Sequence, residues 1–133
     1  MRFEGRTILI LEDEPIIGLA LEDMLANEGA RVLHASRIDE ALDMLAGEHV
    51  DSAILDVNVH GILSYPVAAS LKERAIPFVF ATGYGDRSHP TEFAGVPTVS
   101  KPYSAEEIER ALMTHADTSG SADRRIGGAF SQA

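Results

Sequence analysis

The chain has 133 residues, 45% of them hydrophobic, which fits one domain with one sizeable core and leaves no room for a second catalytic or DNA-binding domain. Its formal net charge of -10 at pH 7 disfavours binding to nucleic acid and to anionic lipid, and its lack of cysteine excludes disulfides and thiolate metal sites. No apolar run approaches the ~18 residues that span a bilayer, and the N-terminus does not resemble a secretion signal, so we expect a soluble, cytoplasmic protein that does not bind membranes.

The first strand and the first helix are the clearest elements of the sequence. "TILIL", residues 7–11, is an unbroken apolar run, and "PIIGLALEDMLANEG", residues 15–29, follows it with the apolar spacing of an amphipathic helix. Pro15 suits a first helical turn, and Gly29 marks the end of the helix.

Strands and helices continue to alternate along the chain. Further strands are expected at residues 30–35, 51–56, 77–82 and 97–101. Further helices are expected at residues 36–47, 64–75 and 104–116. Ser36 is the predicted N-cap of the second helix, and Ser104 with Glu107 has the pattern of a capping box in the last one. This alternation predicts an α/β fold, in which a parallel sheet carries helices on both faces.

Two segments depart from this alternation. Residues 83–96, "GYGDRSHPTEFAGV", carry three glycines and a proline without a helical apolar stripe, which predicts a loop with at most one helical turn. Residues 116–133 are small, polar and glycine-rich, with too little apolar surface to favour an ordered structure. We therefore expect a folded domain over residues 1–115, with a shortened fourth-helix region, and a flexible C-terminal tail.

Polar residues stand where the predicted strands end. Glu12 and Asp13 follow the first strand, Asp56 ends the third, Thr82 ends the fourth and Lys101 ends the fifth. Because the binding crevice of a parallel sheet lies outside the carboxyl ends of its strands, we expect these residues to share one site. A simpler explanation for the acidic run is that it favours the positive end of the dipole of the following helix.

The charges of this predicted cluster restrict its chemistry. Asp13 and Asp56 would repel each other at short range, and one of them would bind a proton unless a cation neutralised the pair. Oxygen ligands suit Mg²⁺, and the five histidines show no spacing typical of transition-metal ligands. With Mg²⁺ bound, Asp56 can act as a nucleophile toward a phosphoryl group, whose oxygens Lys101 and Thr82 would contact.

Four motifs in this order, "LEDEP", "AILDV", "FVFATG" and "VSKPY", resemble the receiver domain of bacterial two-component response regulators. The resemblance covers about residues 6–115 and implies a flavodoxin-like, doubly wound five-stranded parallel sheet with strand order 2-1-3-4-5. It implies Asp56 as the phosphoacceptor, Thr82 as the switch hydroxyl and Lys101 as the phosphate-contacting lysine. It also implies a Mg²⁺ site formed by Glu12, Asp13, Asp56 and the main-chain carbonyl of Asn58.

Two features depart from the usual receiver pattern. Most receivers have an aromatic residue three positions before the lysine, where this chain has Thr98 before Lys101. The stretch "PFVFATGYG" is similar to a stand-alone receiver subfamily with the F-A-T-G-Y motif, in which Tyr84 stands two residues beyond Thr82. We expect the conformational readout within residues 83–95, where phosphorylation pulls Thr82 toward the phosphoryl group and repacks Tyr84.

The resemblance implies a single-domain response regulator and not an enzyme. It would accept a phosphoryl group on Asp56 from a sensor histidine kinase or a phosphotransfer protein, catalyse its own phosphorylation and dephosphorylation, and signal or relay phosphate to a downstream protein. We expect a monomer that pairs transiently. Two alternatives stay open: a pseudo-receiver that binds partners without phosphorylation, and a phosphohydrolase with an Asp nucleophile, for which Asn58 cannot serve as the second acid.

Overall fold

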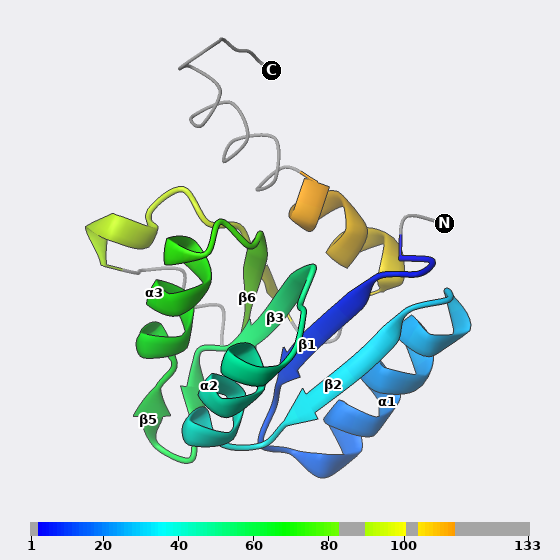
Figure 1. Ribbon diagram of the computed structural model, residues 1–133, viewed down its shortest axis with the longest axis horizontal. Coiled ribbons are helices and arrows are strands. Elements are labelled where there is room, and N and C mark those ends of the chain that lie inside the picture. Colours follow the sequence, from blue (N-terminus) through cyan, green and yellow to red (C-terminus); the bar gives the residue numbers. More distant parts are fainter. Residues whose placement is uncertain (1–2, 83–89, 101–103, 114–133) are drawn as a thin grey trace, which may run out of the picture.

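The computed structural model describes residues 3–82, 90–100 and 104–113 (Figure 1). Its elements, in chain order, are β1 (Thr7–Leu11), α1 (Pro15–Asn27), β2 (Arg31–Ala35), α2 (Ile38–Gly47), β3 (Ser52–Asp56), β4 (Asn58–Val59), β5 (Ile62–Leu63), α3 (Tyr65–Glu73), β6 (Phe78–Thr82), the 3-10 turn η1 (Thr91–Phe93), β7 (Thr98–Ser100) and a helix over residues 105–113. None of the helices in these ranges has the length and apolar character needed to cross a membrane. The predicted tail, residues 116–133, lies outside the described ranges.

Five strands form one parallel sheet in the order β2-β1-β3-β6-β7. Because β4 and β5 form a separate hairpin, this is the predicted order 2-1-3-4-5, and the predicted fold class is confirmed. Every residue of β1, β3 and β6 is buried, as expected for central strands covered on both faces. This double burial explains why the strands are unbroken apolar runs in the sequence.

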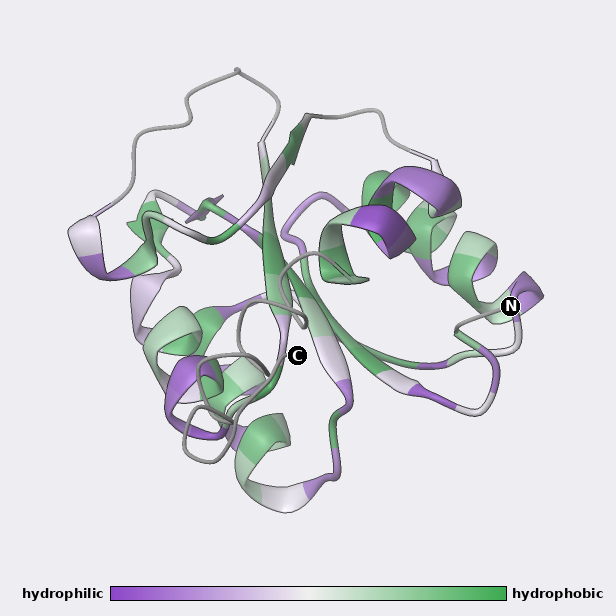
Figure 2. Cartoon of the chain, turned by 90° about the horizontal axis from the view of Figure 1, so that it is seen from above, coloured by the Kyte–Doolittle hydropathy of each residue, from purple (hydrophilic) through white to green (hydrophobic). Residues whose placement is uncertain are grey.

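The side chains of the central strands alternate between two hydrophobic cores. In β1, Leu9 and Leu11 pack in the core under α2 and α3, whereas Ile8 and Ile10 pack in the core under α1 and the helix over residues 105–113. The strands β3 and β6 alternate in the same way. Figure 2 shows the largely hydrophobic sheet running between the two layers of helices. The carboxyl ends of the strands therefore form the edge that neither helix layer covers.

The two ends of α1 and the start of the last helix follow the predictions. α1 begins at Pro15, and Gly29 follows its end with a φ of +91°, a conformation that favours glycine. The Ser104 amide donates to the Glu107 carboxylate at 2.8 Å, and the Glu107 amide donates to the Ser104 hydroxyl at 3.2 Å. The predicted capping box is therefore present.

The prediction that Ser36 caps α2 is wrong. The N-cap is Arg37, which is extended, and no side-chain hydrogen bond caps this end of the helix. Ser36 lies one residue too early, and its amide and hydroxyl donate to the Glu40 carboxylate at 2.9 and 3.3 Å. A glutamate that reaches back from the first turn thus fixes the chain where it enters α2.

A hairpin that was not predicted follows β3. β4 and β5 pair through Asn58↔Leu63 and Val59↔Ile62. The two turn residues, His60 and Gly61, have φ values of +53° and +81°, as in the two-residue turns that match the twist of a hairpin. The sequence signal is "NVHGIL", in which a turn pair stands between short apolar segments, but histidine in place of asparagine or aspartate obscures it.

The connection between β6 and β7 is anchored by one aromatic residue. In its described part, residues 90–97, the helical structure is the single turn η1, in agreement with the predicted short helix region. Phe93 is 2% exposed, and its ring stacks on that of Tyr65 at a centroid distance of 5.5 Å. The Lys72 Nζ donates to the Glu92 carbonyl at 2.8 Å and lies over the Phe93 ring. These contacts attach the connection to α3.

Candidate functional site

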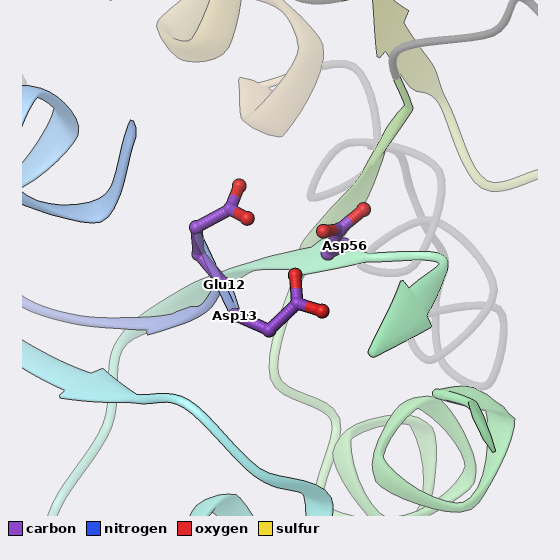
Figure 3. A group of neighbouring side chains, drawn as sticks. All are labelled: Glu12, Asp13 and Asp56. Atoms are coloured by element: carbon purple, nitrogen blue, oxygen red, sulfur yellow. The ribbon is translucent and has the colours of Figure 1, made fainter. Parts of the chain in front are cut away.

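Three of the predicted site residues meet at the carboxyl edge of the sheet. Glu12 and Asp13 follow β1, and Asp56 is the last residue of the neighbouring strand β3. One carboxylate oxygen from each of the three lies within 4.8 Å of the others (Figure 3). Glu12 and Asp56 are buried, with exposed fractions of 2% and 8%. The site is therefore a compact, largely buried group of like charges.

Glu12 is held through both its backbone and its side chain. Its amide donates to the Ala35 carbonyl at 3.0 Å, and its carboxylate accepts the Glu14 amide at 3.0 Å. Its carbonyl lies 3.0 Å from the Nε2 atom of His34. Because a carbonyl only accepts hydrogen bonds, the His34 Nε2 carries the proton in this contact. These bonds direct the Glu12 carboxylate toward the other two acids.

Asp13 is tied to the β4–β5 hairpin. The His60 amide donates to the Asp13 Oδ2 at 2.9 Å, and the His60 Nδ1 lies 3.8 Å from the same oxygen. Burial raises the pKa of Asp13, but the amide hydrogen bonds from His60 and from Asp13 itself, the charge of the His60 ring and a side-chain hydrogen bond with Asp56 outweigh burial and lower the pKa. Asp13 is therefore an anion at neutral pH.

Thr82 stands at the same edge as the acids. It is the last residue of β6, the strand next to β3, and it is 6% exposed. Asp56 is in register with Ala81, and the Val57 amide donates to the Ala81 carbonyl at 3.2 Å. Thr82 thus lies one residue beyond the neighbour of Asp56 on the adjacent strand.

Asn58 is the first residue of β4. Its side-chain Oδ1 accepts the Gly61 amide at 2.9 Å and so stabilises the hairpin turn. The Ser64 amide donates to the Val57 carbonyl at 2.9 Å. Because hydrogen-bonded and non-hydrogen-bonded pairs alternate in an antiparallel ladder, Asn58 occupies a non-hydrogen-bonded pair, and its main-chain carbonyl is directed away from β5.

The atoms gathered here fit a hard divalent cation. Glu12, Asp13 and Asp56 present only carboxylate oxygens, and like charges this close are costly unless a cation or a proton neutralises them. Mg²⁺ is commonly bound by one or two carboxylates together with water molecules. The three acids and the Asn58 carbonyl therefore fit Mg²⁺. The other predicted site residues, Tyr84 and Lys101, lie outside the described part of the chain.

Two residues beside the site, His34 and His60, are not among the predicted site residues. His34 contacts Glu12 from β2, and His60 contacts Asp13 from the hairpin turn. The spacing of the histidines indicates neither contact, since each depends on chain segments that meet only in the folded protein. The turn signal at His60 and Gly61 could have located the second contact.

Comparison with known sequences gives one family. Residues 8–113 match the sequence model of the response regulator receiver domain. A protein of Cyanophora paradoxa named probable transcriptional regulator ycf27 is 34% identical over 116 residues, which make up 84% of this chain and 48% of that protein. A protein of the same name from Galdieria sulphuraria is 36% identical over 109 residues, 79% of this chain and 43% of that protein. The chain thus spans about half the length of these relatives.

Solved structures show the same architecture. The solution structure of SdrG from Sphingomonas melonis Fr1 is 40% identical in sequence, with a TM-score of 0.71, and the match covers 82% of this chain and 94% of that chain. The response regulator TrrA from Thermotoga maritima, crystallised in complex with Mg²⁺-BeF, is 28% identical, with a TM-score of 0.71 and coverage of 81% and 96%.

Proposed function

Because the chain belongs to the response regulator receiver domain family, we propose that it is a receiver that accepts a phosphoryl group on Asp56. Receiver domains act in two-component signalling and are signalling domains, not ordinary enzymes. The proposed donor is a phosphohistidine of a sensor histidine kinase or phosphotransfer protein. A carboxylate oxygen of Asp56 forms a bond to phosphorus while the phosphorus–nitrogen bond of the donor breaks, and the released imidazole takes up a proton.

The convergence of Glu12, Asp13 and Asp56 carries this proposal. A buried carboxylate beside two others would repel an anionic phosphoryl group unless their charge is offset. Mg²⁺ bound by the three acids and the Asn58 carbonyl would supply that compensation. The chain itself supplies the positioning, because main-chain amides hold Glu12 and Asp13 and the end of β3 presents Asp56.

Thr82 and Lys101 complete the proposed site. Thr82 is buried one residue beyond the neighbour of Asp56, where its hydroxyl can donate to a phosphoryl oxygen. Lys101 directly follows Ser100, which is in register with Thr82. In this proposal its ammonium group interacts with the same phosphoryl oxygens as a point charge.

We propose that the signal is read in the connection between β6 and β7. Thr98, at the position where most receivers have an aromatic residue, is half-buried in β7. The described end of the connection is attached to α3 by Phe93. A shift of Thr82 toward the phosphoryl group would then be expressed between Thr82 and Phe93, the part of the chain that contains Tyr84, and repack Tyr84. Unchanged Tyr84 exposure on phosphorylation, measured by fluorescence quenching in a protein whose other two tyrosines are replaced by phenylalanine, would contradict this.

The relatives support the proposal at different levels. The TrrA structure contains Mg²⁺-BeF, which favours a Mg²⁺ site in this chain by similarity. The ycf27 proteins are named probable transcriptional regulators and are about twice as long as this chain. The role in that name therefore refers to those whole proteins and is not transferred to this chain. For this chain we propose protein partners, a cytoplasmic location, and a monomer that pairs transiently. Its acidic charge still predicts that the domain itself does not bind nucleic acid.

The test is intact mass after incubation with a small acyl-phosphate donor and Mg²⁺. We expect the wild type to gain one phosphoryl group, and Asp56→Asn and a chelated sample to gain none. Asp43→Asn, a change of equal charge on the exposed side of α2, should behave as the wild type. No mass gain in any sample would refute the proposal for small donors and favour the pseudo-receiver. Release of phosphate in large excess over protein would favour the phosphohydrolase.

A further inference from the structure

A histidine side chain from the edge strand packs against the backbone of the acidic site. His34 is half-buried near the end of β2, and its Nε2 donates to the Glu12 carbonyl at 3.0 Å. This carbonyl belongs to the peptide unit that joins Glu12 to Asp13. Because a peptide unit is planar and rigid, a bond that fixes its carbonyl also restricts the positions of the two Cα atoms from which the acidic side chains extend.

The position of His34 explains why a side chain is needed there. The ladder between β1 and β2 ends at the pair Leu11↔Ala35. The Glu12 amide still donates to the Ala35 carbonyl at 3.0 Å, but β2 ends at Ala35, so the ladder offers no strand amide for the Glu12 carbonyl. The His34 side chain supplies a donor in place of a strand amide, so residues of β2 hydrogen-bond both the amide and the carbonyl of Glu12.

A glycine on the facing helix makes room for the imidazole. A Cβ atom at Gly18 would lie 2.2 Å from the Cε1 of His34 and 2.6 Å from its Nε2. Gly18 is buried inside α1, where glycine is less favourable than alanine, and it is not among the residues with positive φ. The backbone of α1 therefore does not require this glycine, whereas the His34 ring does.

From these two independent features we propose that His34 is a positioning residue for the acidic site, and that Gly18 is kept small so that the ring can reach the Glu12 carbonyl. The inference rests on the proposed function only in that the expected cation is Mg²⁺. Without this hydrogen bond, the peptide unit between Glu12 and Asp13 loses one of its restraints, and the two carboxylates are held less firmly in the arrangement that binds a cation, although the Glu14 and His60 amides still contact them. The consequence is weaker Mg²⁺ binding by a protein that still folds.

The test is the Mg²⁺ dissociation constant of the full chain, measured by calorimetry without any phosphoryl donor. His34→Leu retains bulk but loses the donor, and Gly18→Ala displaces the ring; we expect each to raise the dissociation constant by about tenfold, as for residues that orient metal ligands. His34→Gln keeps an N–H donor and should recover part of the affinity. Gly47→Ala is the matched control, because a Cβ there contacts nothing within 4 Å.

The dependence of phosphorylation on Mg²⁺ separates positioning from general damage. For His34→Leu we expect a higher Mg²⁺ requirement and a rate near that of the wild type once Mg²⁺ is saturating. Unchanged affinity in His34→Leu and Gly18→Ala, or equal losses in His34→Leu and His34→Gln, would overturn the inference. If His34→Leu does not fold, Gly18→Ala and His34→Gln decide the same question.

The outcomes also distinguish this inference from the proposed function. A wild type that binds Mg²⁺ but gains no phosphoryl group, together with weaker binding by His34→Leu, would support the role of His34 and refute the proposed phosphorylation. A wild type that is phosphorylated, with a Mg²⁺ affinity that His34→Leu does not change, would support the proposed phosphorylation and refute the role of His34. A wild type that binds no Mg²⁺ would overturn both.

Discussion

Replacing Asp56 by asparagine removes one of three clustered carboxylate charges while preserving the shape of the side chain. In the absence of divalent cations, the folded protein must hold Glu12, Asp13 and Asp56 together, whereas the unfolded chain separates them. We therefore expect Asp56→Asn to raise the free energy of unfolding when no Mg²⁺ is present. The same substitution should remove most of the stabilisation that Mg²⁺ gives to the wild type.

The size of this effect follows from the geometry of the cluster. The three carboxylates approach within 4.8 Å of one another, and two unit charges at that separation repel by about 3.5 kcal/mol at an effective dielectric constant near 20. Asp56 faces two such charges, but the protein can avoid the repulsion by binding a proton, which at pH 7 costs about 4 kcal/mol for an ordinary carboxyl. Asparagine replaces the hydrogen bonds of the Asp56 carboxylate less well, which reduces the stabilisation gained from the lost repulsion. We therefore expect Asp56→Asn to increase the free energy of unfolding by about 2 kcal/mol.

The assay is urea unfolding at pH 7, with a chelator and with saturating Mg²⁺, for the wild type, Asp56→Asn and Asp43→Asn. Asp43 is exposed on α2, so its substitution changes the net charge equally without touching the cluster. With chelator, Asp56→Asn should be the most stable of the three; with Mg²⁺, its advantage should shrink or reverse. An Asp56→Asn protein no more stable than the wild type in chelator would show that the three carboxylates do not repel one another as the geometry requires.

Three further predictions concern the supports of the site and the core. His60→Pro should weaken Mg²⁺ binding, because proline has no amide hydrogen to donate to Asp13 and cannot adopt a φ of +53°. His60→Asn keeps the amide and should bind Mg²⁺ nearly as well as the wild type. Equal Mg²⁺ affinities of the two variants in a calorimetric titration would contradict this prediction. Burial raises the pKa of Asp51, but hydrogen bonds and nearby charges outweigh burial and lower it. Because these interactions stabilise the folded protein, Asp51→Asn should reduce the unfolding free energy by about 1 kcal/mol at pH 7. A carboxyl whose pKa is lowered by folding stabilises the folded protein above its ordinary pKa of 3.8, and this stabilisation is lost as the pH falls through the pKa of the folded state. The difference in unfolding free energy between Asp51→Asn and the wild type should therefore disappear in acid. A difference that persists in urea unfolding at acid pH would show that the ionised Asp51 carboxylate is not its cause. Phe93→Ala should destabilise the protein by about 3 kcal/mol and expose Tyr65 to fluorescence quenchers. Unchanged quenching, measured with Tyr84 and Tyr103 replaced by phenylalanine, would show that Phe93 does not cover the Tyr65 ring.

The sheet could be predicted from the sequence because its central strands are buried on both faces. Such strands are short unbroken apolar runs, and "TILIL" corresponds residue for residue to β1. Helix ends with a strong local preference, at Pro15 and Gly29, were also predictable. The start of α2 could not be predicted, because the Glu40 carboxylate fixes the chain there in place of a cap by Ser36. The hairpin could not be predicted either, because a histidine, His60, adopts the positive φ that its turn requires.

The acids of the site could be predicted because topology alone brings the ends of neighbouring parallel strands together. Their supports could not, because these are contacts between segments far apart in the sequence. His34 is 22 residues from Glu12, and His60 is 47 residues from Asp13. Neither histidine has a local spacing that distinguishes it from a surface residue. Gly18 is a usable signal only when the strand that packs against it is known.

The supports of Glu12 and Asp13 share one physical property, which links the architecture to the proposed chemistry. The Glu14 amide holds the carboxylate of Glu12, and the His60 amide holds that of Asp13. Neutral main-chain donors fix the position of a carboxylate and favour its ionised form, but they do not cancel its charge as an arginine or lysine would. The negative charge of these two acids is therefore kept for a cation. Under the proposed function, a site built in this way would bind a divalent ion through preformed geometry and would keep Asp56 unreactive toward phosphoryl groups until that ion is present.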